Sequence, residues 1–305
     1  MTKVICIGHS ALDRVFKVEA WPAASAKVVA TAFAETGGGV AANAAVAVAR
    51  LGGEAAFWGP VGDDSIADAM GAQLRAAGVD IDGMRRFSGL QSSVSAILID
   101  ARGERLIVGY RGTALEVSAD WLPLAQLGAC GALLADTRWP QGALLALHAA
   151  RGAGIAAVLD GDTGEQATLR SLAGESEYAL FSEPGLACFA GEGDIEGALR
   201  QALALGPRLA AVTQGEHGVA WIEAGAPEGL RRMPAFQVSV VDTLAAGDVF
   251  HGAFALMLTE GKAPAEALRF ASAAAALKCS RRGGRDGSPG RDDVERFLRE
   301  NDVRP

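Results

Sequence analysis

The apolar positions of this chain fall into two kinds of run. Short continuous apolar runs predict buried strands, and longer stretches with helical spacing separate the later ones. The expected strands of the main sheet are 4–7, 55–58, 133–135, 156–159, 178–181 and 210–212. Alternation of strand and helix is typical of a mostly parallel, helix-covered sheet. We therefore predict an α/β fold whose polar strand ends converge on one crevice.

A second group of β-rich segments lies outside this alternation. Residues 15–18 and 27–33 are separated by a proline turn, and residues 94–100 and 105–110 flank an Ala-Arg-Gly-Glu turn typical of a β-hairpin. We expect these strands, within about residues 14–35 and 90–115, to form a small sheet that acts as a lid over the site. The whole chain, 1–305, is predicted to be one domain.

Residues 240–254 hold the segment around which the site is predicted. A short apolar run ends at Val241 and predicts a strand, and a helical pattern starts at Val249. Asp242 and Thr243 lie in the turn between them, and the simplest interpretation is that they cap the helix. One cap does not need two aspartates around a turn of small residues, so we favour a functional interpretation.

The small residues of this turn predict an anion site. The N–H groups of Ala245, Ala246 and Gly247 would lie at the positive end of the helix dipole, where phosphate binds readily. Asp248 follows in the first helical turn. A carboxylate beside an anion site is electrostatically unfavourable unless it handles a proton, so we predict that Asp248 is a general base.

Polar and glycine-rich residues near the N-terminus are candidates for substrate binding. Asp13 lies beyond the carboxyl end of the first strand, and Gly37, Gly38 and Gly39 precede Asn43, which runs into a helix predicted for residues 44–51. Three glycines allow a ligand to approach the backbone closely, and Asn43 could offer its amide to hydroxyl groups. A flexible turn followed by an ordinary capping asparagine is an equally good interpretation of this stretch alone.

Four later strands end in polar residues, which together with Asp248 predict a site. They are Asp136 and Arg138, Asp160 and Asp162, Ser182 and Glu183, and Thr213 and Gln214. The carboxylates of Asp160, Asp162 and Glu183 are candidates for holding Mg²⁺ through water, because this ion keeps part of its hydration shell. For Arg138, an ion pair with Asp136 or Asp162 is as good an interpretation as substrate binding.

Composition and net charge indicate which classes of binding partner and which cellular compartment to expect. The 305 residues are half hydrophobic and carry a net charge of −8, which argues against nucleic acid as a partner. The four cysteines are scattered without metal-like spacing, which favours reduced thiols in a cytoplasmic protein. No uncharged apolar run reaches the length of a membrane span, and the N-terminus lacks a signal-peptide pattern.

The motifs together resemble the ribokinase/PfkB family of sugar kinases over nearly the whole chain. The segment Asp242-Thr-x-x-Ala-Gly-Asp248 is similar to the family's second signature, and Gly38-Gly-x-x-Ala-Asn43 is similar to its sugar-binding segment. Val61-Gly-Asp-Asp64, Val212-Thr-x-Gly215 and Asp13 match further family positions. Longer identities, such as Phe181-Ser-Glu-Pro-Gly-Leu-Ala187, resemble the sulfofructose kinases within the family.

This resemblance implies a ribokinase-like three-layer sandwich with a small β-sheet lid. It also implies ATP and Mg²⁺ as cofactors and leaves open a monovalent cation. The implied nucleotide-binding residues are Ser182, Thr213, Gly215, Thr243, Ala275 and Cys279, and the implied sugar-binding residues are Asp13, Gly38, Gly39 and Asn43. Lys27 and Arg138 match residues that bind a sulfonate in sulfofructose kinases, whereas a third position of that set is Gly109 here.

Two departures from the family pattern bear on the site. Ala245 stands where the family usually has glycine, and Ser182-Glu-Pro-Gly185 replaces the usual Asn-x-x-Glu near the metal. We expect an ATP-dependent kinase for the primary hydroxyl of a ketohexose-type sugar with a terminal anion, such as 6-deoxy-6-sulfofructose. Kinases for fructose, fructose 6-phosphate, 2-keto-3-deoxygluconate or a nucleoside, and an inactive sugar- or nucleotide-binding regulator, are the alternatives. A homodimer through the lid is also expected.

Overall fold

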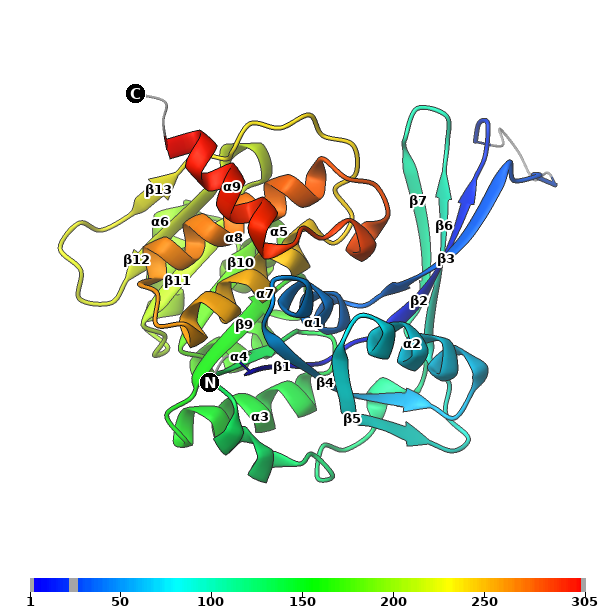
Figure 1. Ribbon diagram of the computed structural model, residues 1–305. Coiled ribbons are helices and arrows are strands. Elements are labelled where there is room, and N and C mark those ends of the chain that lie inside the picture. The colour runs from blue at the N-terminus through cyan, green and yellow to red at the C-terminus, as the bar shows by residue number, and fades with distance from the viewer. Residues whose placement is uncertain (1–2, 22–26, 303–305) are drawn as a thin grey trace.

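The computed structural model describes residues 3–21 and 27–302. In this part of the chain a large mixed sheet lies between two layers of helices, and a small second sheet projects from one side (Figure 1). From one edge to the other, the large sheet consists of β13 (Arg231–Met233), β12 (Val219–Glu223), β11 (Leu209–Thr213), β10 (Tyr178–Ser182), β9 (Ala156–Gly161), β8 (Ala132–Ala135), β1 (Lys3–Ile7), β4 (Glu54–Gly62) and β5 (Val79–Phe87). The strands from β11 to β5 run parallel, and β12 and β13 are antiparallel additions.

Helices cover both faces of this sheet and divide the core into two main clusters. One face packs against α1 (Val40–Arg50), α2 (Ser65–Ala76), α7 (Ala246–Thr259), α8 (Pro264–Cys279) and α9 (Arg291–Asp302). The other face packs against α3 (Pro140–Gly152), α4 (Gln166–Glu175), α5 (Glu183–Ala190) and α6 (Ile195–Leu203). Short 3₁₀ turns connect some of these elements: η1 (Ala114–Glu116), η2 (Leu124–Ala129), η3 (Gly215–His217) and η4 (Gly284–Gly287). The predicted α/β sandwich is confirmed.

Burial on both faces explains why the central strands are continuously apolar. Strands β1, β8 and β9 are almost completely buried because helices cover them from both sides. On one of these faces α1 and α7 lie very close together. A Cβ atom at Gly252 of α7 would come within 2.6 Å of the Ala44 carbonyl oxygen of α1. This close contact brings the start of α1 beside the start of α7.

The small sheet has the strand order β3 (Ala32–Gly38), β2 (Ala11–Lys17), β6 (Ser93–Ile99) and β7 (Arg105–Tyr110). Strands β2 and β6 run parallel, and each outer strand pairs antiparallel with its neighbour. The predicted hairpin of β6 and β7 is confirmed. The strand expected at 27–33 was placed too early, because residues 27–31 lie outside the sheet and pairing with β2 starts at Ala32.

One strand of the predicted site is absent from the described residues. The apolar run that ends at Val241 belongs to no sheet, and Val240 and Val241 are 65% and 46% exposed. The N–H groups of Val241 and Asp242 instead donate to the Cys279 carbonyl at 2.8 and 3.0 Å. The carbonyl at the end of α8 therefore accepts the hydrogen bonds that a neighbouring strand would have accepted. Within the same described part, no helix combines the length and apolar character needed to cross a membrane.

Candidate active site

A cavity of about 530 Å³ lies at the carboxyl ends of the strands, beside the start of α7. It is bounded by η3, by the extended segment that precedes α7, and by one side of α8. The lining residues are Thr213, Gly215, Glu216, Gly218, Val219, Ala235, Phe236, Gln237, Val238, Val240, Thr243, Ala246, Gly247, Phe250, Ser272, Ala275, Ala276 and Cys279. Its walls are largely apolar, and one end is formed by the first residues of a helix.

Five of the six predicted nucleotide-binding residues line this cavity, namely Thr213, Gly215, Thr243, Ala275 and Cys279. The sixth, Ser182, does not. Its hydroxyl accepts the Gly185 N–H at 3.0 Å as the cap of α5 and donates to Asp162 at 3.3 Å. A strand-end serine that precedes a helix is a common cap, and that role competes with ligand binding.

The apolar walls of the cavity are the part that sequence reasoning missed. Phe236 and Val238 belong to the extended segment between β13 and α7, and Phe250 lies on α7. Such walls suit a flat aromatic ligand with a polar tail. The apolar run that ends at Val241 was the available signal, but it was interpreted as a strand, because periodicity alone does not distinguish a buried strand from a segment that lines a pocket.

The first turn of α7 forms the polar end of the cavity. Ala245 adopts the left-handed conformation, with φ of 65°, and is the one non-glycine residue with positive φ in the described ranges. Ala246 donates its N–H to the Thr243 carbonyl at 3.2 Å. This N–H group was predicted to be free for an anion, and in the structure it is not. The Gly247 N–H has no partner among the described residues and borders the cavity. The helix start therefore still presents an unpartnered donor and a positive dipole to a bound anion.

Asp248 lies in this first turn and contacts α1. Its Oδ2 accepts a hydrogen bond from the Asn43 side-chain amide at 2.7 Å. Burial, followed by the negative charge of nearby Asp160, raises the pKa of Asp248 to about 8. The Asn43 bond acts in the opposite direction and favours the charged form. A carboxyl group in this setting can take up a proton near neutral pH, as a general base must.

Asp160 is held by a histidine and does not join a metal cluster. His251 is 2% exposed, and its Nδ1 lies 3.0 Å from Asp160 Oδ2 and 2.8 Å from the Gly247 carbonyl. Its Nε2 lies 3.3 Å from the Leu180 carbonyl. Acceptors face both ring nitrogens, and although burial alone would lower the pKa of His251, the Asp160 charge raises it. His251 therefore pairs with Asp160 and contacts two main-chain carbonyls, close to Asp248 in the same helix.

The predicted trio of metal-binding carboxylates is not assembled. Asp160 pairs with His251, Asp162 pairs with Arg138, and Glu183 accepts from the Gln214 amide at 3.1 Å. In the described part of the chain, no three His, Cys, Asp or Glu side chains lie close enough together to hold a metal ion. Each of the three carboxylates has a partner from another segment, and a role for any of them in holding Mg²⁺ through water stays a prediction.

The predicted sugar-binding residues lie where the lid meets the main body. Asp13 of β2 accepts a hydrogen bond from the Ser95 hydroxyl of β6, and burial raises the pKa of Asp13. A Cβ atom at Gly38 would come within 2.2 Å of the Asp13 carboxylate. Gly39 has φ of 91°, and a Cβ there would come within 2.4 Å of the Ser10 backbone. These glycines leave room for Asp13 and for the tight passage into α1.

Asp136 connects several segments of this region, although the sequence marked it only as one of the polar strand ends and as a possible partner of Arg138. Its carboxylate accepts N–H bonds from His9 at 2.8 Å, Ala41 at 3.1 Å and Arg138 at 2.8 Å. Burial raises the pKa of Asp136 to about 6, although these N–H bonds oppose that effect. One buried carboxyl group therefore fixes the ends of β1 and β8 against the start of α1.

The two basic residues predicted to bind an anion lie in different settings. Arg138 forms an ion pair with Asp162, which is one of the two interpretations left open above. Lys27 is exposed in a shallow hollow lined by residues 19–20 and 27–31. No hydrogen bond or ion pair joins Lys27 to Arg138 within the described ranges, so its substrate-binding role stays a prediction.

The structure adds Arg111, which sequence reasoning missed, to this region. His9 follows β1, and its Nε2 has no hydrogen-bond partner among the described residues. Burial, and then the charges of Arg138 and Arg111, lower the pKa of His9 to about 4. The charges of both arginines therefore act on the half-buried imidazole of His9. Nothing in the sequence around Arg111 signalled this, because it follows a lid strand far from the strand ends of the main sheet.

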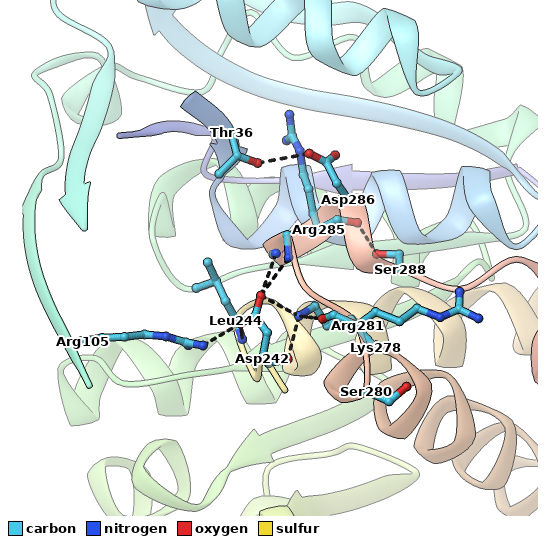
Figure 2. Close-up of polar contacts among 12 residues, drawn as sticks. Thr36, Arg105, Asp242, Leu244, Lys278, Ser280, Arg281, Arg285, Asp286 and Ser288 are labelled. Carbon is cyan, nitrogen blue, oxygen red and sulfur yellow. Dashed lines mark hydrogen bonds and ion pairs between the residues drawn. The ribbon is translucent and has the colours of Figure 1, made fainter. Parts of the chain in front are cut away.

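Asp242, the other aspartate of the turn, connects three segments (Figure 2). Its Oδ1 accepts from Leu244 at 3.0 Å and from Arg105 of β7 at 2.6 Å. Its Oδ2 accepts the N–H groups of Gly283 and Gly284 at 3.1 and 3.0 Å. Asp242, for which a helix cap was the simpler interpretation, is thus a junction between the lid, the turn before α7 and the loop after α8.

Known proteins of similar sequence and structure agree with the function that this geometry suggests. The profile described as pfkB family carbohydrate kinase matches residues 1–291. The chain belongs to the PfkB family of carbohydrate kinases. It is 33% identical to a ribokinase from Bacillus subtilis, with 98% of this chain and 100% of that protein covered. It is 30% identical to an ATP-dependent ribose-1-phosphate kinase from Halopiger xanaduensis, with 98% and 99% covered.

Solved structures of the PfkB family show the same architecture. A crystal structure of an Agrobacterium tumefaciens protein provisionally named a ribokinase matches with a TM-score of 0.94 and 39% identity, over 99% of both chains. A ribokinase from Thermotoga maritima matches with a TM-score of 0.84 and 29% identity, over 97% of this chain and 99% of that one. The protein is therefore an ATP-dependent carbohydrate kinase with a ribokinase-like fold.

Proposed function

We propose that this PfkB kinase transfers the γ-phosphoryl group of ATP to the primary hydroxyl of a ketohexose-type sugar that carries a terminal anion. The observation on which the transfer depends is Asp248, a carboxyl group with a pKa of about 8 beside the unpartnered Gly247 N–H. The cavity would hold the nucleotide, with the adenine ring between its apolar walls and the phosphates at the start of α7.

In the proposed reaction Asp248 accepts the proton of the attacking hydroxyl group. The hydroxyl oxygen bonds to the γ-phosphorus, the bond between that phosphorus and the bridging oxygen breaks, and ADP leaves with the electron pair. The Gly247 N–H and the α7 dipole stabilise the charge on the transferring group. Asp13 and Asn43, with the space left by Gly38 and Gly39, orient the sugar.

Magnesium fits this site only as an ion held mainly by phosphate oxygens and water, because no three carboxylates are grouped in the described residues. Glu183 would be its closest protein partner, since Glu183 contacts Gln214 at the end of β11 next to the cavity. When bound, the ion would neutralise charge on the phosphates.

Two observations support a substrate with an anionic end. The charges of Arg138 and Arg111 both act on His9, which follows β1, and Arg111 is exposed. The Halopiger relative is named a kinase of ribose 1-phosphate, a sugar that already carries an anion. The ion pair of Arg138 with Asp162 favours the second candidate, a neutral sugar such as ribose or fructose, as in the relatives named ribokinase and fructokinase.

A substrate panel tests this proposal directly. ATP consumption is measured with 6-deoxy-6-sulfofructose, fructose 6-phosphate, ribose 1-phosphate, 2-keto-3-deoxygluconate, fructose, ribose and adenosine. We expect the highest kcat/KM with an anionic sugar. A higher value with fructose, ribose or adenosine would contradict the anion, and absence of turnover on all substrates would favour an inactive binding protein.

Arginine variants then locate the anion site. Arg111→Gln and Arg138→Gln should each lower kcat/KM for the best anionic substrate by about 10- to 100-fold, because a charge-assisted hydrogen bond is lost. Fructose turnover should change much less. Arg299→Gln, at an exposed position of α9, is the matched control. Equal losses for charged and neutral sugars would show that the two arginines support the fold and do not bind the anion.

The lid supports a further part of the proposal, a homodimer. Leu106, Ile107 and Val108 of the edge strand β7 are 50–61% exposed, as is Phe33 of the opposite edge strand at 58%. Exposed apolar edge strands are candidates for pairing with a second chain. Ile107→Glu should convert a dimer, seen by light scattering, into a monomer. A wild-type monomer at micromolar concentration would contradict the proposal.

A further inference from the structure

Lys278, near the end of α8, is a buried charge for which the proposed reaction has no role. Its side chain is 0% exposed. Removing an ammonium group from water costs several kcal/mol unless it is paired and hydrogen-bonded. Something in the fold must therefore compensate for this burial.

An oxygen-lined nest surrounds the ammonium group (Figure 2). Lys278 Nζ donates to the Asp242 carbonyl at 2.8 Å and to the Arg281 carbonyl at 3.4 Å, and it lies 3.4 Å from Asp242 Oδ2. Burial lowers the pKa of Lys278, and the Asp242 charge opposes that effect. Two main-chain carbonyls and a carboxylate thus share one cation.

The position of this nest connects it to the phosphate end of the nucleotide cavity. Asp242 begins the turn that continues through Ala245 into α7, and its N–H is bonded to Cys279 at the end of α8. The ammonium group links the same two segments from the other side, because Asp242 and Arg281 supply its carbonyl partners. It therefore holds the turn that sets the direction of the Gly247 N–H and of Asp248.

A nest of carbonyls and a carboxylate is also the chemistry that binds a large monovalent ion such as K⁺. Ammonium and potassium ions take similar oxygen partners at similar distances. Here the position among these oxygens is filled by a side chain of the protein. The nest therefore does not fit the monovalent cation that the family resemblance left open.

We propose that Lys278 is a tethered internal cation that replaces a dissociable monovalent metal ion and fixes the turn of residues 242–247 for nucleotide binding. Lys278 is a positioning residue, since it contacts neither nucleotide nor sugar in this scheme. The kinase would then be active without K⁺ or Na⁺. The positive charge that a dissociable ion could otherwise supply would come from the Lys278 side chain.

The test compares monovalent cations at constant ionic strength, with tetramethylammonium, Li⁺, Na⁺ or K⁺ as the only one present. ADP affinity is measured by calorimetry and the melting temperature by fluorescence, so neither readout needs the sugar. Wild type should vary by less than about two-fold in ADP affinity, because no ion binding is linked to folding or nucleotide binding. A K⁺-specific rise in wild-type affinity or melting temperature would overturn the proposal.

Lys278→Ala opens the nest and supplies the complementary result. In tetramethylammonium its ADP affinity should fall by about 10-fold or more, since the turn loses its cation. Potassium should restore both the ADP affinity and the melting temperature of the variant, and both effects should saturate as K⁺ fills the nest. The folding equilibrium should shift by about 100-fold towards the folded state when K⁺ reaches 100 times its Kd. Lys262→Ala, an exposed lysine, should behave as wild type.

A folded Lys278→Ala variant with wild-type ADP affinity in tetramethylammonium would also overturn the proposal, as would a variant with weakened affinity that K⁺ does not restore. If the variant is unfolded in every salt, the wild-type series decides alone. Failure of the sugar panel would leave these readouts unaffected, so the two proposals can fail separately.

Discussion

Asp242 and Asp248 lie in one short turn, yet their surroundings give them opposite chemistry. Asp242 accepts main-chain N–H bonds from Leu244, Gly283 and Gly284, and two cationic side chains contact it. Burial alone would raise the pKa of Asp242, but these bonds and charges hold it below its ordinary value. Asp248 has one amide donor and another carboxylate nearby, and its pKa rises to about 8.

The difference shows that the two aspartates of one sequence motif have separate roles, one structural and one chemical. A carboxylate surrounded by donors stays charged and joins segments, so Asp242 stabilises the turn. A carboxylate with few donors is costly to keep charged, so Asp248 is ready to accept a proton. The same residue type therefore acts as a fixed anion at one end of the turn and as a base at the other.

The largest expected effect comes from removing the base. Asp248→Asn should lower kcat by about 10²–10⁴-fold, the usual contribution of general-base catalysis. A variant that folds and retains nearly normal turnover would show that Asp248 is not the base.

The same variant should be more stable than wild type. Because the pKa of Asp248 in the folded protein, about 8, lies above the unfolded value, the folded state binds the proton more tightly and wild-type stability falls as pH rises towards 8. In urea unfolding from pH 4 to pH 8, the free energy of unfolding of the variant should rise relative to that of wild type as pH rises. A constant difference across this range would contradict the raised pKa.

Asp242 should behave in the reverse way in stability measurements. Asp242→Asn leaves Lys278 buried without its anionic partner, and we expect a loss of about 3–5 kcal/mol in the free energy of unfolding. The pKa of Asp242 is lowered, so its stabilisation is present above the unfolded pKa and disappears as pH falls through the folded one. Urea unfolding at pH 7 measures the loss, with exposed Asp120→Asn as the control.

The hydrogen bond between Asn43 and Asp248 sharpens the comparison further. Because this bond favours the charged carboxylate, Asn43→Ala should raise the pKa of Asp248 by about one unit, the equivalent of one hydrogen bond. The midpoint of kcat/KM against pH should move to higher pH by this amount, in addition to any rise in KM. An unchanged or more acidic midpoint would show that another group controls the profile.

The smallest expected effect concerns Ala245, between the two aspartates. Its left-handed conformation costs an alanine about 1–2 kcal/mol, whereas glycine adopts it freely. Ala245→Gly should therefore raise the free energy of unfolding by about 1 kcal/mol, after allowance for the more flexible unfolded chain. Denaturation in urea would measure it, and a loss of stability would show that the alanine methyl group makes a compensating contact.

Local pattern was sufficient for much of the fold and for part of the site. The central strands, the lid hairpin and the helix starting near Asp248 were predicted because hydrophobic periodicity reports burial directly. Thr213, Gly215 and Cys279 were predicted from motifs and line the cavity. The segment before Val241 was misjudged, because an apolar run has the same appearance whether it pairs with a strand or borders a pocket.

The sequence by itself determined the order of elements and the small-residue turn with an aspartate at each end. Only the tertiary structure decided which partner each carboxylate would meet: Asp160 meets His251, Asp162 meets Arg138, and Asp242 meets Lys278. Such partners lie as far apart in the chain as Arg105 and Asp242, which are separated by 137 positions. Residue type and spacing fix the local backbone, whereas the pKa of an acid depends on neighbours that packing alone brings close.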